Sequence, residues 1–336
     1  MLRHPTILVT GGAGFIGSAF VGQAVERGQK VIVLDALTYA GRRSNLEWID
    51  PAGYELVVGN IADGPLVDSL LRKHSIDAIV HFAAESHVDN SISKPVAFIE
   101  TNIVGSYVLL EAAREYWNEL KGTKKEQFRF IHVSTDEVYG ALGETGKFDE
   151  NTPKKPSSPY SASKAASDHL AHAWFATYGL PTIITNCSNN YGPRQFPEKL
   201  IPLTITNALA GKPLPVYGNG SNIRDWIHVE DHCDGVALAL GKGIPGETYC
   251  FGGNSERRNI EVVNQICRIL DRLRPAKSGA SYASQITFVR DRLGHDYRYA
   301  IDDTKAQQQL GFRRKYDFEA GLESTVEWYL HEYALA

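Results

Sequence analysis

The stretch Thr6–Gly17 reads TILVTGGAGFIG. Its first five residues form an apolar, β-branched run that predicts a buried strand. The turn that follows carries Gly11, Gly14 and Gly17. Glycine permits a sharp turn at the first position, approach of a pyrophosphate to the backbone at the second, and close packing of helix and strand at the third. A helix predicted over Phe15–Arg27 would offer its free N–H groups to the phosphates, so this stretch predicts a dinucleotide-binding unit.

Strands and helices alternate through the rest of the first half of the chain. Further apolar strands are predicted at Lys30–Leu34, Tyr54–Val58, Ala78–Phe82, Phe128–Val133 and Pro181–Thr185, and helices at Pro65–Lys73, Val96–Trp117 and Ser161–Tyr178. Continuous apolar strands separated by helices are typical of a parallel sheet covered on both faces. We therefore expect a Rossmann-type, doubly wound α/β fold in which Pro181–Thr185 closes the sheet.

The composition of the sequence changes near residue 186, where prolines and glycines become frequent. Shorter strands and helices alternate irregularly from there to the end. We interpret residues 1–185 as a dinucleotide-binding domain and residues 186–336 as a smaller α/β lobe that binds the substrate. No linker-like stretch separates the two, so some segments are expected to cross between the lobes.

The composition argues against several classes of protein. The chain has 336 residues, 43% of them apolar, which is enough for a full hydrophobic core. Thirty-five basic and thirty-nine acidic residues are mixed along the chain, so no nucleic-acid surface is expected. No continuous apolar run approaches about 18 residues, so we expect no membrane span.

The N-terminus, MLRHPTILVTGG, lacks the long apolar stretch of a signal peptide, which predicts a cytoplasmic protein. The four cysteines lie far apart with no paired spacing, and the histidines have no second ligand at metal-binding spacing. We therefore expect neither a disulfide framework nor a metal site.

The second predicted strand ends in an acid, Asp35. Its distance from the glycine turn is close to that of a carboxylate that accepts ribose hydroxyls and repels a 2′-phosphate. This favours NAD over NADP. Arg42 and Arg43 follow closely and would favour the phosphate, but we interpret them as solvated loop charges.

Two residue pairs predict chemistry. Tyr160 and Lys164 are four residues apart, which places both side chains on one helix face. The lysine is expected to lower the pKa of the phenol and to hold the nicotinamide ribose. Asp136 and Glu137 directly follow a strand, at the edge where ligands bind in open α/β sheets. Adjacent carboxyl groups there should differ in pKa and suit general acid and base work, although an acidic helix cap is the alternative.

These features resemble a known family. The glycine turn, the Tyr160/Lys164 pair and Thr135 together resemble the extended short-chain dehydrogenase/reductases, and Asp136–Glu137 resembles the nucleotide-sugar 4,6-dehydratases among them. Longer matching strings extend nearly to the C-terminus, at Ala83–Asp89, His132–Gly140, Ser158–Ala165, Cys187–Pro193, Gln195–Leu203, Arg224–Cys233 and Asp291–Tyr299.

The resemblance implies a reaction that converts dTDP-glucose to dTDP-4-keto-6-deoxyglucose through bound NAD. Tyr160 would remove the proton of the sugar 4-hydroxyl, to which Thr135 hydrogen-bonds, while hydride passes from carbon 4 to NAD. Glu137 would take the proton from carbon 5. Protonated Asp136 would donate to the leaving 6-hydroxyl, and hydride would return to carbon 6.

The resemblance also implies the binding residues. The NAD set is Gly11, Gly14, Phe15, Ile16, Gly17, Asp35, Ala36, Leu37, Thr38, Asn60, Ile61, Ala83, Ala84, Thr101, Tyr160, Lys164 and Asn190. The substrate set is Ser86, Thr135, Asn189, Lys199, Leu200, Pro215, Tyr217, Arg224, Asn259, Arg292 and His295. Three of its members are cations suited to a diphosphate, and Tyr217 is suited to stacking on a pyrimidine.

Three positions depart from the family pattern and leave the base and the sugar open. Asn60 stands where Asp is expected, Asn186 where Arg is usual, and Arg194 where Tyr is common. A 4,6-dehydratase of UDP-glucose or of an N-acetylhexosamine nucleotide is therefore the nearest alternative. An epimerase is disfavoured by Asp136–Glu137, and a silent NAD-binding regulator by the presence of every catalytic residue type.

The resemblance further implies a homodimer. The predicted helices Val96–Trp117 and Ser161–Tyr178 are similar to the pair that forms a four-helix interface in this family. The alternative is that both helices are covered within one subunit.

Overall fold

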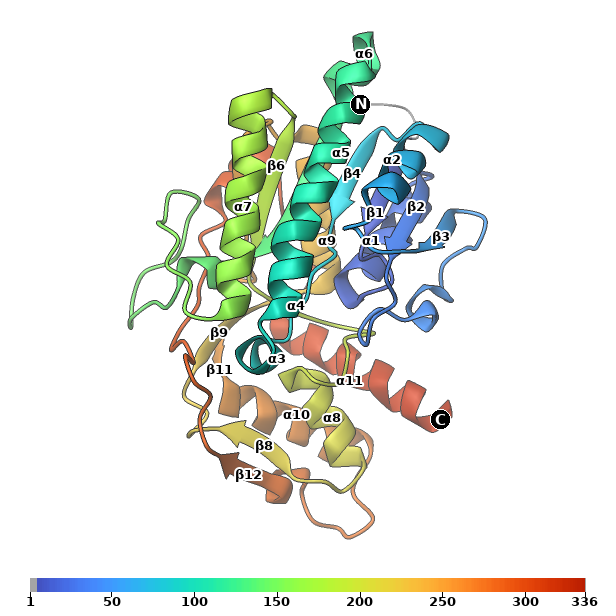
Figure 1. Cartoon of the computed structure of the whole chain (residues 1–336). Coiled ribbons are helices and arrows are strands. Elements are labelled where there is room, and N and C mark those ends of the chain that lie inside the picture. The colour runs from blue at the N-terminus through green and yellow to red at the C-terminus, as the bar shows by residue number, and fades with distance from the viewer. Residues whose placement is uncertain (1–4, 336) are drawn as a thin grey trace.

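A seven-stranded parallel sheet forms the centre of the molecule (Figure 1). The computed structural model describes residues 5–335. Residues 1–4 and Ala336 lie outside the described residues, so the stretch expected to lack a signal peptide is described only from residue 5. The strand order is β10-β6-β5-β4-β1-β2-β3. The bounds are β1 Thr6–Thr10, β2 Lys30–Asp35, β3 Tyr54–Val58, β4 Ala78–His81, β5 Arg129–Thr135, β6 Thr182–Cys187 and β10 Thr248–Phe251.

Helices cover both faces of this sheet, which confirms the predicted Rossmann-type fold. On one face lie α1 (Phe15–Glu26) and α9 (Val229–Lys242); on the other lie α2 (Gly64–Lys73), α5 (Ser106–Glu119) and α7 (Pro159–Tyr178). Neighbouring residues of β1 show the alternation: Ile7 and Val9 belong to the first core, and Leu8 belongs to the second. The three central residues of the strand are apolar because both of its faces are buried.

The prediction that Pro181–Thr185 closes the sheet is wrong. Beyond β6 the sheet continues with β10, which pairs in parallel with it. The four-residue strand lies in the glycine- and proline-rich part of the chain, and its partner β6 is about sixty residues away in the sequence. Both α9 and β10 belong to the second half of the chain yet complete the first core, while the boundary at residue 185 stays a prediction.

The second lobe lies below the sheet in Figure 1. Its helices are α8 Leu200–Leu209, α10 Asn259–Leu273 and α11 Phe318–Leu335. Two small sheets accompany them, one ordered β11-β9-β7 and one pairing β12 with β8. Their strands are β7 Asn189–Tyr191, β8 Leu214–Tyr217, β9 Ile223–His228, β11 Glu256–Arg258 and β12 Ile286–Val289. A separate hydrophobic core joins these elements, so the lobe can present a rigid surface to the edge of the large sheet.

The segment predicted as one helix over Val96–Trp117 is divided into three helical elements in the structure. The segment expected to be a single helix consists of α4 (Val96–Phe98), the π-helical η2 (Ile99–Gly105) and α5. Together, Val96–Glu119 are long and apolar enough to cross a membrane by length and composition, a test that core helices also pass. Only the α5 part of the run contributes to the core on the central sheet.

The remaining short elements connect these layers. They are α3 Val88–Ser93, α6 Gly122–Gln127, η1 Arg43–Leu46, η3 Asp136–Tyr139, η4 Tyr282–Gln285 and η5 Ala306–Leu310.

Candidate active site

The glycine turn after β1 is closely packed. Gly11 has a φ of 70°, and a Cβ there would lie 2.6 Å from the backbone nitrogen of Ala83. A Cβ at Gly17 would lie 2.1 Å from the carbonyl oxygen of Gly11. The carboxylate of Asp35 ties the turn to β2, because it accepts the N–H groups of Ala13 at 2.9 Å and Leu37 at 2.8 Å. Only glycine fits both positions, as the motif predicted.

We predict that Gly17→Ala weakens NAD binding at least about tenfold, because the added methyl group must push the turn away from α1. Isothermal titration with NAD measures the loss. Gly143→Ala is the matched control, since nothing lies within 4 Å of a Cβ at Gly143. An affinity equal to that of the unchanged protein would contradict this packing argument.

A cleft of about 330 Å³ opens at the carboxyl ends of the strands. The predicted cofactor residues that line it are Gly11, Gly14, Phe15, Ile16, Gly17, Asp35, Ala36, Thr38, Asn60, Ile61, Ala83, Ala84, Thr101, Tyr160, Lys164 and Asn190. Of that set, Leu37 alone is absent from the lining, because its side chain packs against the core beneath the glycine turn.

The cleft fits a dinucleotide. The first turn of α1 carries no acidic side chain that would repel a pyrophosphate. Four buried polar atoms of cleft residues have no protein partner among the described residues: Ser134 Oγ, Asp136 Oδ2, Asn189 Oδ1 and Gln195 Oε1. Buried polar groups in folded proteins are normally satisfied, so these four indicate a polar ligand in the cleft.

The acid pair lies at the end of β5. Thr135 ends the strand, and its hydroxyl caps η3 by accepting the N–H of Glu137 at 3.3 Å. Burial, followed by the charge of Glu137, raises the pKa of Asp136 well above its ordinary value. Burial also raises the pKa of Glu137, but Lys199, Arg292 and Arg224 oppose the rise. The two pKa values therefore differ as expected, with that of Asp136 raised further, while the assignment of Asp136 as acid and Glu137 as base stays a prediction.

Tyr160 lies in the first turn of α7. This helix begins two residues before the predicted start, because Ser158 and Ser161 form a reciprocal cap and Pro159 occupies the first position. The expected lowering of the Tyr160 pKa by Lys164 is wrong for this arrangement. Burial first, and then the charge of Glu137, raise that pKa, whereas a hydrogen bond with Thr135 lowers it.

Lys164 lies one turn further along α7 and is buried. Its ammonium donates to the carbonyl oxygen of Val133 at 2.8 Å. Burial lowers the pKa of Lys164 to about 8, and the charge of Asp168 opposes that shift. The carboxylate one helical turn away therefore helps to keep Lys164 charged at neutral pH.

Asp168 joins the catalytic helix to the catalytic strand. Its carboxylate lies 2.7 Å from Lys154 Nζ and 3.2 Å from His132 Nε2. Burial raises the pKa of Asp168. The hydrogen bond with His132 and the charge of Lys154 outweigh this effect and hold the pKa well below its ordinary value. The neighbouring Asn186 donates to the backbone oxygen of Thr135 at 2.9 Å. This network lies behind the reactive residues rather than in the cleft.

We predict that Asp168→Asn moves the alkaline limb of the activity profile to lower pH by about 1 unit. Lys164 is protonated below its pKa, so activity that needs its charge falls as the pH rises through about 8, and removal of the carboxylate lowers that point further. Lys154→Gln is expected to shift the limb the other way, because the Lys154 charge lowers the same pKa. Profiles of kcat against pH test both. A shift in the same direction for both variants would contradict the electrostatic explanation.

Three cations on the substrate side face the acid pair. Lys199 lines the cleft and donates to the carbonyl oxygen of Ser86 at 2.9 Å. Arg224 is buried and donates to the carbonyl oxygens of Ile223 at 2.8 Å and Asp296 at 3.0 Å. Arg292 Nε is buried and lies 3.9 Å from a carboxylate oxygen of Asp89, too far for a hydrogen bond. Carbonyl oxygens accept hydrogen bonds from these cations without neutralising them. Their positive charge is therefore left to bind a diphosphate.

The other predicted substrate residues divide between the two lobes. Ser86, Thr135 and Asn189 line the cleft. The residues outside its lining are Leu200, Pro215, Tyr217, Arg224, Asn259, Arg292 and His295. Among these, Tyr217 packs edge-on against His295 and donates to Asp89 at 3.0 Å. The structure therefore places the ring of Tyr217 near Arg292, because both side chains approach Asp89. A nucleotide base could stack on that ring.

Two acidic cleft residues escaped the sequence reasoning. Glu85 and Glu198 line the cleft, and Tyr39 donates to Glu198 at 3.2 Å. Burial, followed by the charge of Glu198, raises the pKa of Glu85. Glu85 lies within a string that carried the family resemblance, but no local pattern separates it from an ordinary loop acid.

The three departures from the family pattern have different positions. Asn60 lines the cleft, whereas Asn186 is buried behind Thr135 and is absent from the lining. The guanidinium of Arg194 lies over the ring of Trp48 at 4.1 Å and is likewise absent from it. Only one of the three departures therefore contacts the cofactor cleft directly.

Fold and site together define the class of protein. The parallel sheet, the glycine turn, and Tyr160 and Lys164 on one helix are those of a short-chain dehydrogenase/reductase-type enzyme. A model of the family described as GDP-mannose 4,6 dehydratase matches residues 8–325. The chain belongs to this family.

Similar proteins agree over nearly the full length. The chain is 60% identical to a dTDP-glucose 4,6-dehydratase of Xanthomonas campestris pv. campestris (strain B100), covering 97% of this chain and 93% of that protein. It is 55% identical to dTDP-glucose 4,6-dehydratase 1 of Escherichia coli (strain K12), covering 96% and 92%. A crystal structure of the Bacillus anthracis str. Ames dTDP-glucose 4,6-dehydratase in complex with NAD superposes with a TM-score of 0.87 at 46% identity, covering 98% of each chain.

Proposed function

We propose that the chain converts dTDP-glucose to dTDP-4-keto-6-deoxyglucose and water, with NAD as its resident cofactor. One observation carries the proposal: a carboxyl pair, the buried Asp136 and the half-buried Glu137, lines the same cleft as Tyr160 and the glycine turn. Oxidation alone needs the tyrosine, whereas elimination of water needs an additional acid and base.

Tyr160, in its phenolate form, accepts the proton of the sugar 4-hydroxyl and becomes a phenol. Its hydrogen bond with Thr135 lowers the Tyr160 pKa and so favours the phenolate that begins the cycle. Once carbon 4 is a ketone, the proton on carbon 5 is acidic, and Glu137 removes it. Burial beside Glu137 raises the pKa of Asp136 well above its ordinary value and so favours its protonated form, which can give its proton to the departing 6-hydroxyl. The two carboxyl groups thus divide the elimination between them.

The cofactor would be held by the glycine turn, Asp35 and Lys164. When bound there, NAD would supply a reversible hydride acceptor and donor. Lys199, Arg224 and Arg292 bind the diphosphate of the substrate and hold the sugar over Glu137.

The decisive experiment incubates the purified protein with dTDP-glucose carrying deuterium on carbon 4. The expected product is lighter than the substrate by one water molecule and carries the label on its new methyl group. An epimer of unchanged mass, or loss of the label to solvent, would overturn the proposal. Parallel reactions with UDP-glucose and an N-acetylhexosamine nucleotide test the alternative substrates, and faster turnover of either would reassign the base or the sugar.

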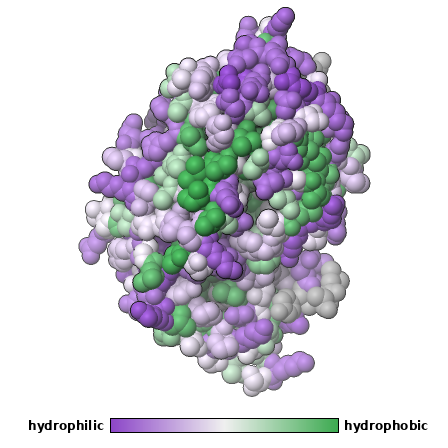
Figure 2. Space-filling view, viewed as in Figure 1, coloured by the Kyte–Doolittle hydropathy of each residue, from purple (hydrophilic) through white to green (hydrophobic). Residues whose placement is uncertain are grey.

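We further propose a homodimer formed through the helices beside α7. Val96, Ile99, Val104 and Tyr107 are 45–64% exposed, and all lie on the run from α4 to α5. Figure 2 shows apolar surface gathered over this part of the molecule. A continuous exposed apolar stripe of this kind is typical of an interface between subunits.

We predict that Val104→Glu converts a dimer to a monomer, because the charge would be buried at the centre of that stripe. Light scattering after size exclusion measures the mass. Ile244→Glu is the matched control, since Ile244 is 54% exposed and lies outside the stripe. A monomer mass for the unchanged protein at micromolar concentration would exclude the dimer.

We also propose that the protein acts in the cytoplasm and binds neither nucleic acid nor membrane. The support is the near balance of thirty-five basic and thirty-nine acidic residues in the sequence. Fractionation of cells that express the tagged chain, followed by detection in soluble and membrane fractions, tests this proposal.

A further inference from the structure

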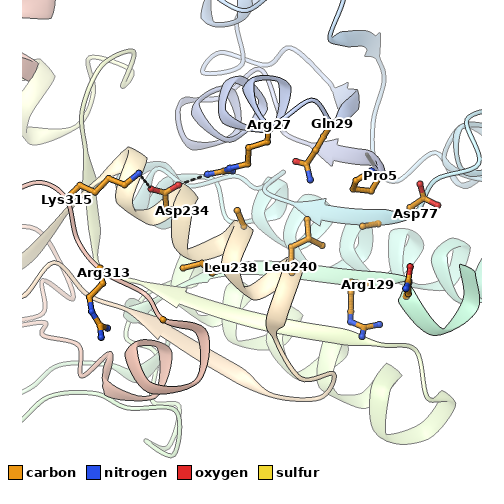
Figure 3. Close-up of a pocket in the computed structure, with 15 residues that line it drawn as sticks. Pro5, Arg27, Gln29, Asp77, Arg129, Asp234, Leu238, Leu240, Arg313 and Lys315 are labelled. Carbon is orange, nitrogen blue, oxygen red and sulfur yellow. Dashed lines mark hydrogen bonds and ion pairs between the residues drawn. The ribbon is translucent and has the colours of Figure 1, made fainter. Parts of the chain in front are cut away.

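A second cavity lies at the opposite edge of the large sheet (Figure 3). Its volume is about 520 Å³, within the range of small-molecule sites. Pro5, Gln29, Asp77 and Arg129 line it, and each lies at or just before the start of a strand. The active-site cleft lies at the other ends of the same strands, so the rear cavity is a separate site.

One wall of the rear cavity is apolar. Leu238 and Leu240 project into it from α9, as Figure 3 shows. Both side chains are only partly buried, although α9 otherwise packs in the core. A ligand that covered them would therefore gain hydrophobic stabilisation that the chain alone leaves unused.

The charge around this wall is positive. Four cations and two carboxylates line the cavity, in a chain whose net charge is -4. Asp234 is paired with both Arg27 and Lys315. Arg129 and Arg313 have no carboxylate partner among the described residues. The rear cavity thus holds two unneutralised guanidinium groups.

Both of these arginines are held in place by backbone carbonyl groups. Nη1 of Arg129 donates to the carbonyl oxygens of Glu126 at 2.8 Å and Phe128 at 2.7 Å. Nη1 of Arg313 donates to the carbonyl oxygen of Phe312 at 2.7 Å. Within the described part of the chain, the Nε and Nη2 groups of both have no acceptor. Each guanidinium is therefore oriented with a donor edge left for an anion.

One polar atom of the cavity is also unsatisfied. Gln127 Oε1 is buried and has no hydrogen-bond partner among the described residues. Such an atom is costly to bury unless a donor reaches it. A ligand or ordered water in the rear cavity would supply that donor.

We propose that the rear cavity binds a small organic anion whose apolar body covers Leu238 and Leu240 and whose phosphate or carboxylate group binds Arg313 or Arg129. The apolar wall argues against a free inorganic ion, and the two free guanidinium groups argue against a neutral ligand. Nothing in the proposal depends on the reaction in the front cleft.

The test follows the methyl NMR signals of Leu238 and Leu240 in the full-length protein. NAD and dTDP are present at saturating concentration, so that probes cannot act through the front cleft. Octyl phosphate and octanoate are expected to shift these signals saturably, and the tighter of the two identifies the anionic group. Inorganic phosphate alone is expected to bind at least about tenfold more weakly, because it leaves the apolar wall uncovered.

Variants separate the two parts of the site. Arg313→Gln is expected to raise the dissociation constant of the octyl probe about ten- to hundredfold, as loss of a charged hydrogen bond predicts. Leu238→Trp should fill the rear cavity and abolish binding. Arg268→Gln, the same charge change on α10, is the matched control. Unmoved leucine signals, equal affinity for octyl and inorganic phosphate, or unchanged affinity in Arg313→Gln would each overturn the proposal.

Discussion

Tyr160→Phe is expected to lower the rate of substrate oxidation by about 10²–10⁴-fold, the usual contribution of a positioned proton acceptor. The variant keeps the ring that packs edge-on against Phe98, with centroids 6.3 Å apart, so the start of α7 is retained. Burial raises the pKa of the Tyr160 phenol above its ordinary value, so the group is neutral in the folded and unfolded chain at neutral pH and its removal changes no charge there. The loss should therefore appear in activity and not in stability.

The measurement is the rate of product formation after mixing of enzyme, NAD and dTDP-glucose, with thermal unfolding followed in parallel. Tyr116→Phe is the matched control, because Tyr116 is also a buried phenol but donates to the carbonyl oxygen of Ile76, away from the cleft. If Tyr160→Phe still oxidised the sugar at the normal rate, another group would have to accept the hydroxyl proton.

Glu137→Gln is expected to separate oxidation from elimination. Tyr160 and Lys164 remain intact, so oxidation of carbon 4 proceeds, whereas removal of the carbon-5 proton slows by about 10²–10⁴-fold. NADH absorbance should then rise and persist, where the unchanged enzyme shows little. The glutamine fills the same space under Lys199, Arg224 and Arg292, although their charges lose a partner.

The control for this change is Glu85→Gln, which alters another cleft carboxyl group with a raised pKa that has no part in the proton transfers. It should turn over without accumulating NADH. A folded Glu137→Gln enzyme that releases product at the normal rate would show that a different base removes the carbon-5 proton.

Features that depend on interactions between residues close in the sequence were predicted more accurately than features that depend on distant segments. The turn at Gly11–Gly17 was predicted because its requirement is local: the backbone must bend within a few residues, and a side chain cannot fit. The acid pair was predicted because it directly follows a strand of the sheet. The start of α7 was missed by two residues because its cap depends on two serines, which also occur widely in loops.

Interactions between distant segments were harder to predict. The strand β10 was missed because its pairing with β6 joins residues far apart in the sequence. The Tyr160 pKa was misjudged because the helical spacing shows Lys164 but not the burial of the ring beside Glu137. The link from Lys154 through Asp168 to the catalytic helix was not foreseen, because Lys154 comes from a loop of irregular structure.

The order of strands and helices, the phosphate-binding turn and the types of reactive side chain were determined by the sequence itself, because each depends on periodicity or on steric limits within a few residues. Tertiary structure alone decided which carboxyl group is the more readily protonated, how Lys164 keeps its charge, and where two arginines remain unpaired behind the sheet. Those properties depend on burial and on charges brought together from distant segments, and the electrostatic energy of a side chain is set by its neighbours in space.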